Sequence, residues 1–294
     1  MSDFRAGHVA IVGRPNVGKS TLMNRLIGAK LSITSKKAQT TRHRIHGILT
    51  TPACQYVFVD TPGFQTRHRN ALNRAMNRAV SGALADVDLV LLVIEAGSWR
   101  EEDKAVLAKL SPDVPVVLVI NKVDRMADRN RLLPFIAQIA AAHEFADIVP
   151  ISAEDGDNVE ALLKAAARHL PESPPIHDSE ELTDRSERFL AAELLREKLF
   201  RNLGEELPYG IAVEIEKFEE VDGVRRIHAA IIVDKEAHKA IVIGKGGERM
   251  KRVASDARKD MERLFDGKVW LETWVKVKSG WADDERALRS LGYE

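Results

Sequence analysis

The sequence predicts an α/β protein in two parts, a doubly wound sheet followed by a smaller α+β domain. Near-continuous apolar runs at 88–95 and 114–120 are typical of strands that are covered on both faces, and stretches with helical spacing lie between them. Two adjacent prolines in the polar stretch 171–175 then interrupt this alternation. We expect domains at 1–171 and 183–294, joined by a stiff, solvated linker at 172–182.

The first domain is expected to alternate strands and helices along its length. Short apolar runs predict buried strands, and two of them, 45–50 and 55–60, are close enough in sequence to form a hairpin. Between the other strands, apolar residues recur at helical spacing. The expected strands are 8–12, 45–50, 55–60, 88–95, 114–120 and 148–151, and the expected helices are 21–27, 71–84, 101–110, 129–143 and 158–169.

The second domain has a different order of elements. Leu195, Leu199 and Leu203 recur at every fourth position and predict an amphipathic helix over 184–203. Strands are expected at 209–217 and 226–234, then a helix at 247–264 and a last strand at 269–277. This order predicts a separate α+β domain.

Composition places the chain among globular proteins. The 44 basic and 44 acidic side chains balance, so a basic bias has to be sought locally. The single cysteine, Cys54, excludes an intrachain disulfide, and we interpret it as an ordinary strand residue in a reducing compartment. The first residues lack the pattern of a signal peptide and no apolar run has the length of a membrane span, so we expect a cytoplasmic protein.

A strand and a helix enclose a glycine-rich segment with the spacing of a phosphate-binding loop. It is Gly13-Arg14-Pro15-Asn16-Val17-Gly18-Lys19-Ser20, and Thr21 follows in the helix. The glycines let successive backbone N–H groups point at a phosphate, and the helix N-terminus adds a favourable dipole. Lys19 is expected to reach the β- and γ-phosphates, and the Ser20 hydroxyl to bind Mg²⁺. The alternative, a glycine turn with a chance Lys-Ser pair, is disfavoured by the flanking strand and helix.

Motifs at the ends of three other strands indicate a guanine nucleotide. Asp60-Thr61-Pro62-Gly63 offers a carboxylate for Mg²⁺ and a glycine N–H for the γ-phosphate. In Asn121-Lys122-Val123-Asp124 the last carboxylate can accept from the N1–H and amino group of guanine, whereas adenine presents the opposite edge. Lys122 can lie along the purine face. In Ser152-Ala153-Glu154 the Ala153 N–H can reach the guanine oxygen.

A fourth segment, Gln39-Thr40-Thr41-Arg42, lies between the first helix and the second strand and is the expected switch I. Here we expect Thr41 to complete the Mg²⁺ shell that Ser20 and Asp60 begin. Each motif alone has a simpler explanation, such as a turn or a helix cap. Their order and spacing together predict a site for GTP or GDP with Mg²⁺.

With these motifs the chain resembles the translation-factor class of small GTPases. It is most similar to the Era family in GRPNVGKS, KAQTTRHR, DTPG, NKVD and SAE, and the resemblance covers almost the whole chain. It implies a P-loop GTPase domain with slow hydrolysis. Phe64 stands where many GTPases have the glutamine that orients water. Related GTPases imply instead that Asn16 holds K⁺ beside the phosphates, with Lys19 and Asn16 as the catalytic residues; a loop-shaping role for Asn16 is the alternative.

The second domain contains Gly244-Lys245-Gly246-Gly247 directly before its long helix. A G-x-x-G loop clamps a nucleic-acid backbone in KH domains. Residues 225–278 carry 14 basic against 8 acidic side chains, a local excess of six positive charges in a neutral chain. The expected RNA-binding residues are these four loop residues with Arg249, Lys251 and Arg252. A glycine turn beside a solvated basic helix is the alternative.

The Era resemblance, which includes 275–289, favours a type II KH domain. The KH pattern requires a short helix at 238–243, where local propensity favours a strand, and we follow the pattern. Stacking on bases is open to Trp270, Trp274 and Trp281, and for the first two we favour the alternative of packing in the core.

The resemblance also implies the partners. The KH domain of such a protein binds the 3′ end of small-subunit (16S) ribosomal RNA, and the role is maturation of the small ribosomal subunit. The cofactors are GTP or GDP with Mg²⁺ and K⁺. The family is also found in peripheral contact with the inner face of the cell membrane, and we expect a monomer. A GTP-regulated scaffold whose second domain binds protein is the alternative.

Overall fold

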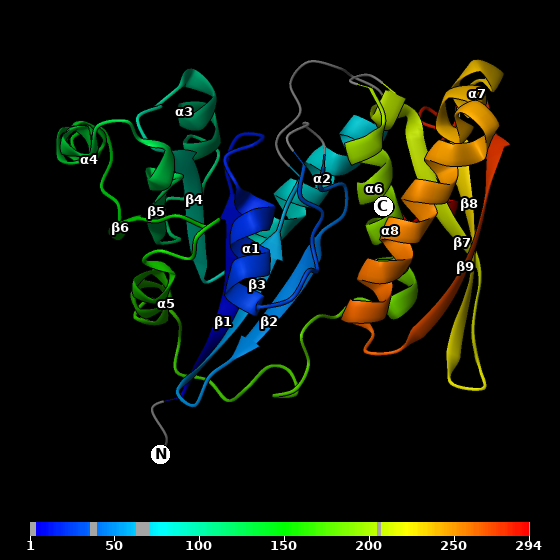
Figure 1. The fold of residues 1–294 in the computed structure, drawn as a ribbon. Helices are drawn as coiled ribbons and strands as arrows, with labels where there is room; N and C mark the ends of the chain where they lie inside the picture. Colours follow the sequence, from blue (N-terminus) through cyan, green and yellow to red (C-terminus); the bar gives the residue numbers. More distant parts are fainter. Residues whose placement is uncertain (1–3, 36–39, 63–70, 205–206, 294) are drawn as a thin grey trace. The chain divides into compact units, whose positions relative to one another are not determined.

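The structure is a computed structural model that describes residues 4–35, 40–62, 71–204 and 207–293 (Figure 1). The chain divides into two compact units. The first consists of residues 1–32, 41–65 and 77–184, and the second of residues 33–40, 66–76 and 185–294.

A six-stranded sheet forms the centre of the first unit. Its strands are Arg5–Val12 (β1), Ile45–Thr50 (β2), Cys54–Asp60 (β3), Leu89–Glu95 (β4), Val116–Asn121 (β5) and Asp147–Pro150 (β6). They lie in the order β2-β3-β1-β4-β5-β6, with all neighbours parallel except β2 and β3, which form the expected antiparallel hairpin. The parallel strands end at one edge of the sheet, so the motifs that follow β1, β3, β5 and β6 meet there.

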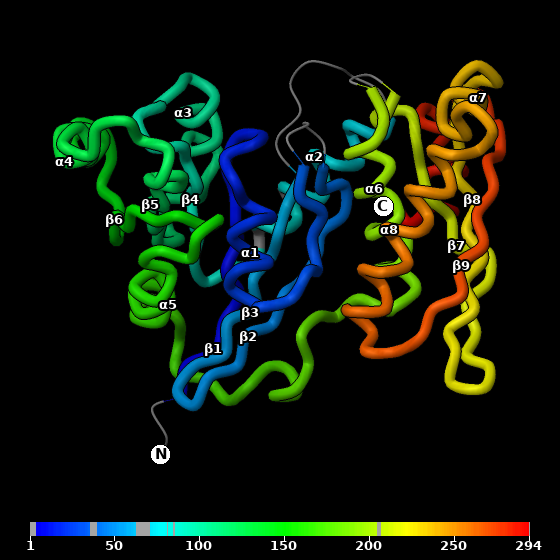
Figure 2. Tube along the Cα trace, in the orientation of Figure 1, coloured from blue at the N-terminus to red at the C-terminus, as the bar shows by residue number. Residues whose placement is uncertain are grey.

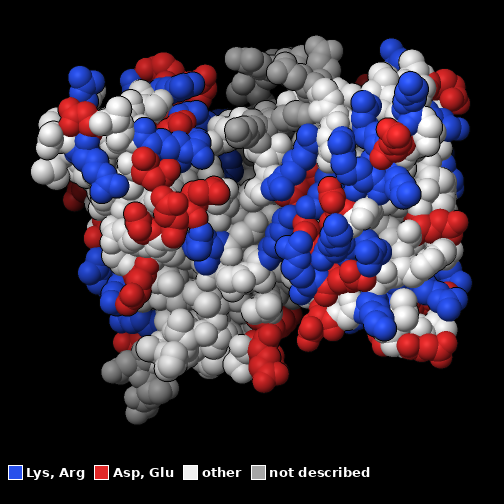
Figure 3. Space-filling model, viewed as in Figure 1, with Lys and Arg blue, Asp and Glu red and all other residues white. Residues whose placement is uncertain are grey.

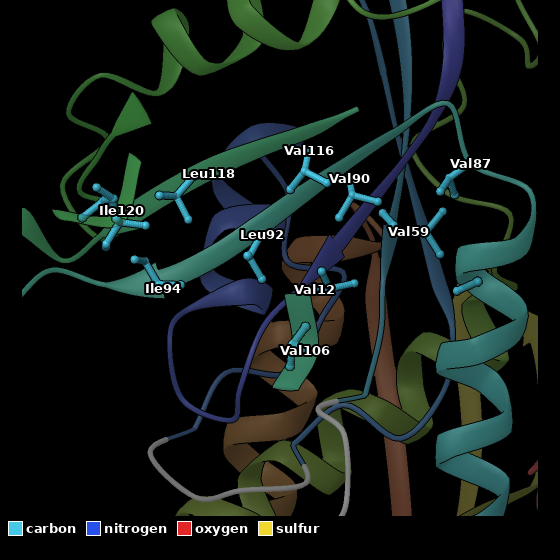
Figure 4. Packing of buried hydrophobic residues seen from close by; sticks show 13 residues of the cluster. Val12, Val59, Val87, Val90, Leu92, Ile94, Val106, Val116, Leu118 and Ile120 are labelled. Atoms are coloured by element: carbon cyan, nitrogen blue, oxygen red, sulfur yellow. The ribbon is translucent and has the colours of Figure 1, made fainter. Parts of the chain in front are cut away.

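Helices cover both faces of this sheet, which confirms the doubly wound fold (Figure 1). They are Lys19–Ile27 (α1), Ala71–Ala85 (α2), Glu101–Leu107 (α3), Leu132–Ala140 (α4) and Val159–Ala167 (α5), with 3₁₀ turns at Val123–Arg125 and Arg129–Arg131. Figure 4 shows the core on one face, where strand residues such as Val12, Leu92 and Leu118 pack with side chains from α2, α3 and α4. This packing fixes the strand ends that carry the motifs.

The segment expected as a solvated linker is bound to the edge of the first unit. The buried amide of Gln55 accepts from the backbone N–H groups of Ile176 (2.6 Å) and His177 (2.9 Å) and donates to the carbonyl of His177 (2.9 Å). The N–H of Ile48 donates to the carbonyl of Leu182 over 2.9 Å. These bonds attach residues 176–182 to β2 and β3, and their path can be followed in Figure 2.

Three strands and two long helices form the core of the second unit. The strands are Ile211–Val221 (β7), Val224–Val233 (β8) and Lys268–Val277 (β9), in the order β7-β8-β9, with β7 and β8 antiparallel and β8 and β9 parallel. The helices are Glu187–Asn202 (α6), Glu236–Ile243 (α7), Glu248–Leu264 (α8) and Glu285–Ser290 (α9), with 3₁₀ turns at Leu207–Gly210 and Lys245–Gly247. The α+β class is confirmed, and α7 provides the short helix that the KH pattern required.

The expectation was wrong for Trp270, which is not in the core, and for Trp281, which is. Trp281 is 1% exposed, donates from Nε1 to the carbonyl of Gly210 (3.1 Å) and packs in a cluster with Leu288 of α9. Trp270 is 47% exposed, and its ring lies 5.2 Å from that of His228. Trp274 is half-buried on the same side of β9, since residues two or four apart in a strand share a face. The exposed Trp270 and the half-buried Trp274 therefore lie on one face of β9, and the buried Trp281 anchors the C-terminal segment.

Two segments distant in sequence from the KH region pack within the second unit. Ala71 and Leu72, at the start of α2, donate from their N–H groups to Asp283 Oδ1 (3.2 Å) and the carbonyl of Ala282 (3.1 Å). Thr34 binds α6, because Arg201 Nη2 donates to the hydroxyl of Thr34 over 2.8 Å. No helix among the described residues is long and apolar enough to cross a membrane.

Candidate nucleotide site and KH loop

The phosphate loop follows β1 and needs glycine at two positions. Gly13 has φ of +150°, and a Cβ there would overlap the carbonyl oxygen of Val93. Gly18 has φ of +104°, and a Cβ there would overlap Nδ2 of Asn121. Both conditions exclude other residues, because an L side chain would be strained and would also collide. The glycine spacing of the motif thus reflects close packing against β4 and against residues 121–124 after β5, which we call the base loop.

The side chain of Lys19 folds back onto the phosphate loop. Its side chain is buried, and Nζ donates to the carbonyls of Gly13 (3.0 Å) and Arg14 (3.1 Å). Burial lowers the pKa of Lys19 to about 8, with Asp60 raising it and Arg14 lowering it further. Its position at the first turn of α1 lets the amine meet phosphate oxygens held by the loop.

Ser20, Thr41 and Asp60 come together as expected. Asp60 Oδ2 accepts from Ser20 Oγ (3.0 Å) and Thr41 Oγ1 (3.1 Å), and the two hydroxyls lie 2.9 Å apart. Asp60 is fully buried, and its Oδ1 has no hydrogen-bond partner among the described residues. Burial raises the pKa of Asp60, while the charge of Lys19 and the hydroxyls of Ser32, Ser20 and Thr41 oppose that rise. Such a cluster of hard oxygen donors fits Mg²⁺.

The described residues next to Thr41 and Asp60 in their motifs do not join this oxygen cluster. Thr61 donates from its hydroxyl to the carbonyl of Ile11 (3.1 Å), so its side chain fastens β3 to β1. The carbonyl of Thr40 accepts from Nη2 of Arg196 in α6, within the second unit. Pro62 and Arg42 are buried. Gln39, Gly63 and Phe64 lie outside the described residues, and the predictions for them stay predictions.

The base loop is bonded to the phosphate loop. Asn121 donates from Nδ2 to the carbonyl of Val17 (2.8 Å) and accepts at Oδ1 from the N–H of Ala153 (2.9 Å). Lys122 has φ of +67° and donates from Nζ to the carbonyl of Asn16 (2.7 Å). These bonds join three of the motifs into one structure.

Asp124 and Ser152 complete this region. Asp124 Oδ1 is buried without a hydrogen-bond partner among the described residues, so it is available to accept from a base. Val123 precedes it in the 3₁₀ turn that begins after Lys122. The buried Ser152 hydroxyl donates to Asp155 (3.1 Å), which folds the loop that presents Ala153. The contact from Ala153 to guanine remains a prediction.

The KH loop is open to solvent. Gly244, Gly246 and Gly247 have φ of +75°, +59° and +78°, and a Cβ at Gly246 would have no neighbour within 4 Å. Lys245, Lys251 and Arg252 are exposed. Arg249 instead donates to the carbonyl of Ile241, so its guanidinium is bonded to the end of α7. Basic side chains gather over α6 and α8 in the view of Figure 3.

Comparison with known proteins identifies both units. Residues 8–122 match a family described as 50S ribosome-binding GTPase, and residues 206–282 match the KH domain. A GTPase Era from Nitrosomonas eutropha is 59% identical over 293 residues, which is 100% of this chain and 99% of that relative. This chain belongs to the Era GTPase family.

Two solved Era structures share the fold over the whole chain. A crystal structure of an Aquifex aeolicus Era variant bound to GDP and AlF₄⁻ has a TM-score of 0.95 and 39% identity, and covers 99% of each chain. A crystal structure of Era with MgGDPNP and nucleotides 1506–1542 of 16S ribosomal RNA has a TM-score of 0.95 and 40% identity, with the same coverage. The first unit is therefore an Era-type GTPase domain, and the second contains its KH domain.

The lowered pKa of Lys19 predicts that nucleotide affinity falls with rising pH. Bound phosphates favour the charged amine, so binding takes up a proton once free Lys19 begins to lose it, near pH 8. We expect the affinity for a fluorescent GDP analogue to fall about fivefold between pH 8 and pH 9. The same measurement on Lys19→Ala, which binds the nucleotide more weakly, gives the part of the pH dependence that arises from ionisation of the guanine base. An equal pH dependence in both proteins would exclude Lys19 as its source.

The free oxygen of Asp124 predicts a change of base preference in Asp124→Asn. An amide donates where the carboxylate accepted, so the variant suits the changed edge of xanthine. Competition between GDP and xanthosine diphosphate measures the preference, and we expect it to shift by about a hundredfold towards xanthosine. Asp113→Asn, on an exposed turn, is the matched control and should keep the GDP preference. An unchanged preference in Asp124→Asn would show that another group contacts the base.

Proposed function

We propose that this chain is a slowly hydrolysing GTP switch that binds the 3′ end of 16S ribosomal RNA and assists maturation of the small ribosomal subunit. The observation that carries the RNA half is the open G-x-x-G loop at Gly244–Gly247, beside the exposed Lys251 and Arg252 of α8. The Era complex with nucleotides 1506–1542 of 16S ribosomal RNA supports the choice of ligand.

In the nucleotide half, Ser20, Thr41 and Asp60 would hold Mg²⁺, which neutralises charge on the phosphates when bound. The unpartnered Oδ1 of buried Asp60 supports this assignment. Lys19 would bind the β- and γ-phosphates, since its amine already lies inside the loop. Asp124 would select guanine, and the Lys122 stem would lie along the base. These residues bind and orient GTP for attack by water.

Potassium is proposed as the second cation, with Asn16 as its side-chain ligand. The side chain of Asn16 is exposed, and its carbonyl is fixed by Lys122. A monovalent cation beside the phosphates would offset the charge that develops during hydrolysis, in a chain with Phe64 at the usual glutamine position.

Asn16→Ala tests this proposal. GTP affinity should stay within about twofold of wild type, because the backbone bonds of the loop remain. The excess of the hydrolysis rate in KCl over that in NaCl should disappear. Asn130→Ala, an exposed amide outside the loop, is the control and should retain the excess. A wild-type rate that is the same in both salts would refute the potassium role.

The RNA proposal is tested at Gly246. Aspartate and asparagine both tolerate positive φ, so the two variants share the same backbone cost and differ mainly in charge. For a 16S 3′-end oligonucleotide we expect binding weaker by about threefold in Gly246→Asn and by about thirtyfold in Gly246→Asp, measured by filter binding at fixed salt. GTP hydrolysis without RNA should be unchanged in both.

Equal affinity of wild type and Gly246→Asp would show that this loop is not the RNA clamp. If wild type has no salt-dependent RNA affinity at all, the alternative of a GTP-regulated scaffold with a protein-binding second domain would lead. We place the protein in the cytoplasm as a monomer. Peripheral contact with the inner face of the cell membrane is carried over from the family resemblance, and cell fractionation tests it.

A further inference from the structure

One carboxylate contacts both loops of the nucleotide site. Glu95 is the last residue of β4, and in the sheet it pairs with Asn121 at the end of β5. Its Oε2 accepts from Nη2 of Arg14 in the phosphate loop over 3.1 Å. Its Oε1 lies 3.2 Å from Nζ of Lys122 in the base loop. Glu95 therefore joins two cations that belong to different motifs.

Each of these cations is also fixed on its other side. Arg14 is buried, and its Nε donates to the buried carboxylate of Asp103 on α3 over 3.3 Å. Ser98 Oγ accepts from the same guanidinium at 3.3 Å. The Arg14 side chain is thus held by groups of the protein, so that its contribution to phosphate binding is through the backbone. Lys122 Nζ donates to the carbonyl of Asn16 as well as facing Glu95.

Charge makes this arrangement depend on an ionised Glu95. Burial acts to raise its pKa, but hydrogen bonds and positive charge from Lys122 and Arg14 outweigh burial, and the pKa of Glu95 lies below its usual value. The carboxylate is therefore charged at neutral pH. Without it, Lys122 and Arg14 would keep their charges and lose their common partner.

We propose that Glu95 is a positioning residue that slows the release of guanine nucleotide by fixing the phosphate loop and the base loop to each other. A bound nucleotide contacts both loops, and it leaves only when both release it. Loss of the Glu95 carboxylate removes one contact of Lys122 in the base loop and one contact of Arg14 in the phosphate loop at the same time, and so breaks the link between the two loops. Loss of the Glu95 carboxylate should therefore lower the activation free energy of nucleotide release by more than it lowers the free energy of unfolding.

The test is the release rate of a fluorescent GDP analogue from the full-length protein, measured by chase with excess GDP. Glu95→Gln keeps the shape and removes the charge, and we expect release about tenfold faster. Glu95→Asp keeps the charge on a shorter stem, and its rate should lie between those of wild type and Glu95→Gln. Glu101→Gln is the control, because Glu101 has an 85% exposed side chain and pairs with Lys104 in solvent.

The order of the two variants separates pairing from packing. If Glu95 acts only by filling space, the isosteric Glu95→Gln will release GDP more slowly than the shorter Glu95→Asp, and the proposal fails. It also fails if Glu95→Gln releases GDP at the wild-type rate. Should Glu95→Gln not fold, the GDP release rate of Glu95→Asp is compared with that of the control Glu101→Gln. Equal release rates overturn the proposal. Faster release from Glu95→Asp, with an unchanged unfolding temperature, supports it. Neither RNA nor potassium enters this measurement.

Discussion

Close packing at the carboxyl edge of the six-stranded sheet underlies the rest of the nucleotide site. Gly13 lies against the carbonyl of Val93 in β4, and Gly18 lies against Asn121 at the end of β5. These approaches are possible because β1, β4 and β5 are parallel neighbours that end together. They leave no space for side chains, and they bring the phosphate loop within hydrogen-bond distance of the base loop. Because the two loops lie this close, Asn121 and Lys122 can donate to carbonyls of the phosphate loop. Lys122 also pairs with Glu95 at the end of β4.

The sequence was sufficient for the motif residues because their chemistry demands fixed spacing. Lys19, Ser20 and Asp60 lie where the loop and strand ends predicted, and the doubly wound fold follows from the apolar runs. Glu95 carried no such signal, since an acid after an apolar strand is common at a sheet edge. Gln55 was missed for a similar reason. A single polar residue in a strand does not show that its amide is buried and bonded to a distant segment.

In the second unit, local pattern and tertiary structure disagreed twice. Propensity alone favoured a strand at 238–243, and the family pattern corrected it to α7. No such correction was available for the tryptophans. The alternation in β9 shows that Trp270 and Trp274 share a face, but it does not show which face the helices cover. Trp281 follows the strand in a turn, and its burial depends on a C-terminal segment that folds back on β7 and β8.

The attachment of residues 176–182 to β2 and β3 has a consequence for dividing the chain into fragments. A piece that stops at residue 171 would keep every nucleotide motif, yet it would remove three of the four hydrogen bonds of the Gln55 amide and leave only the one to the Thr50 hydroxyl. The amide oxygen would lose both of its donors, and a buried oxygen without a partner costs on the order of a few kcal/mol, which is a large share of the stability of an ordinary domain. The sheet edge at Ile48 would also lose its bond to Leu182. The smallest fragment that preserves the GTPase sheet intact therefore extends through the proline-rich segment to residue 184.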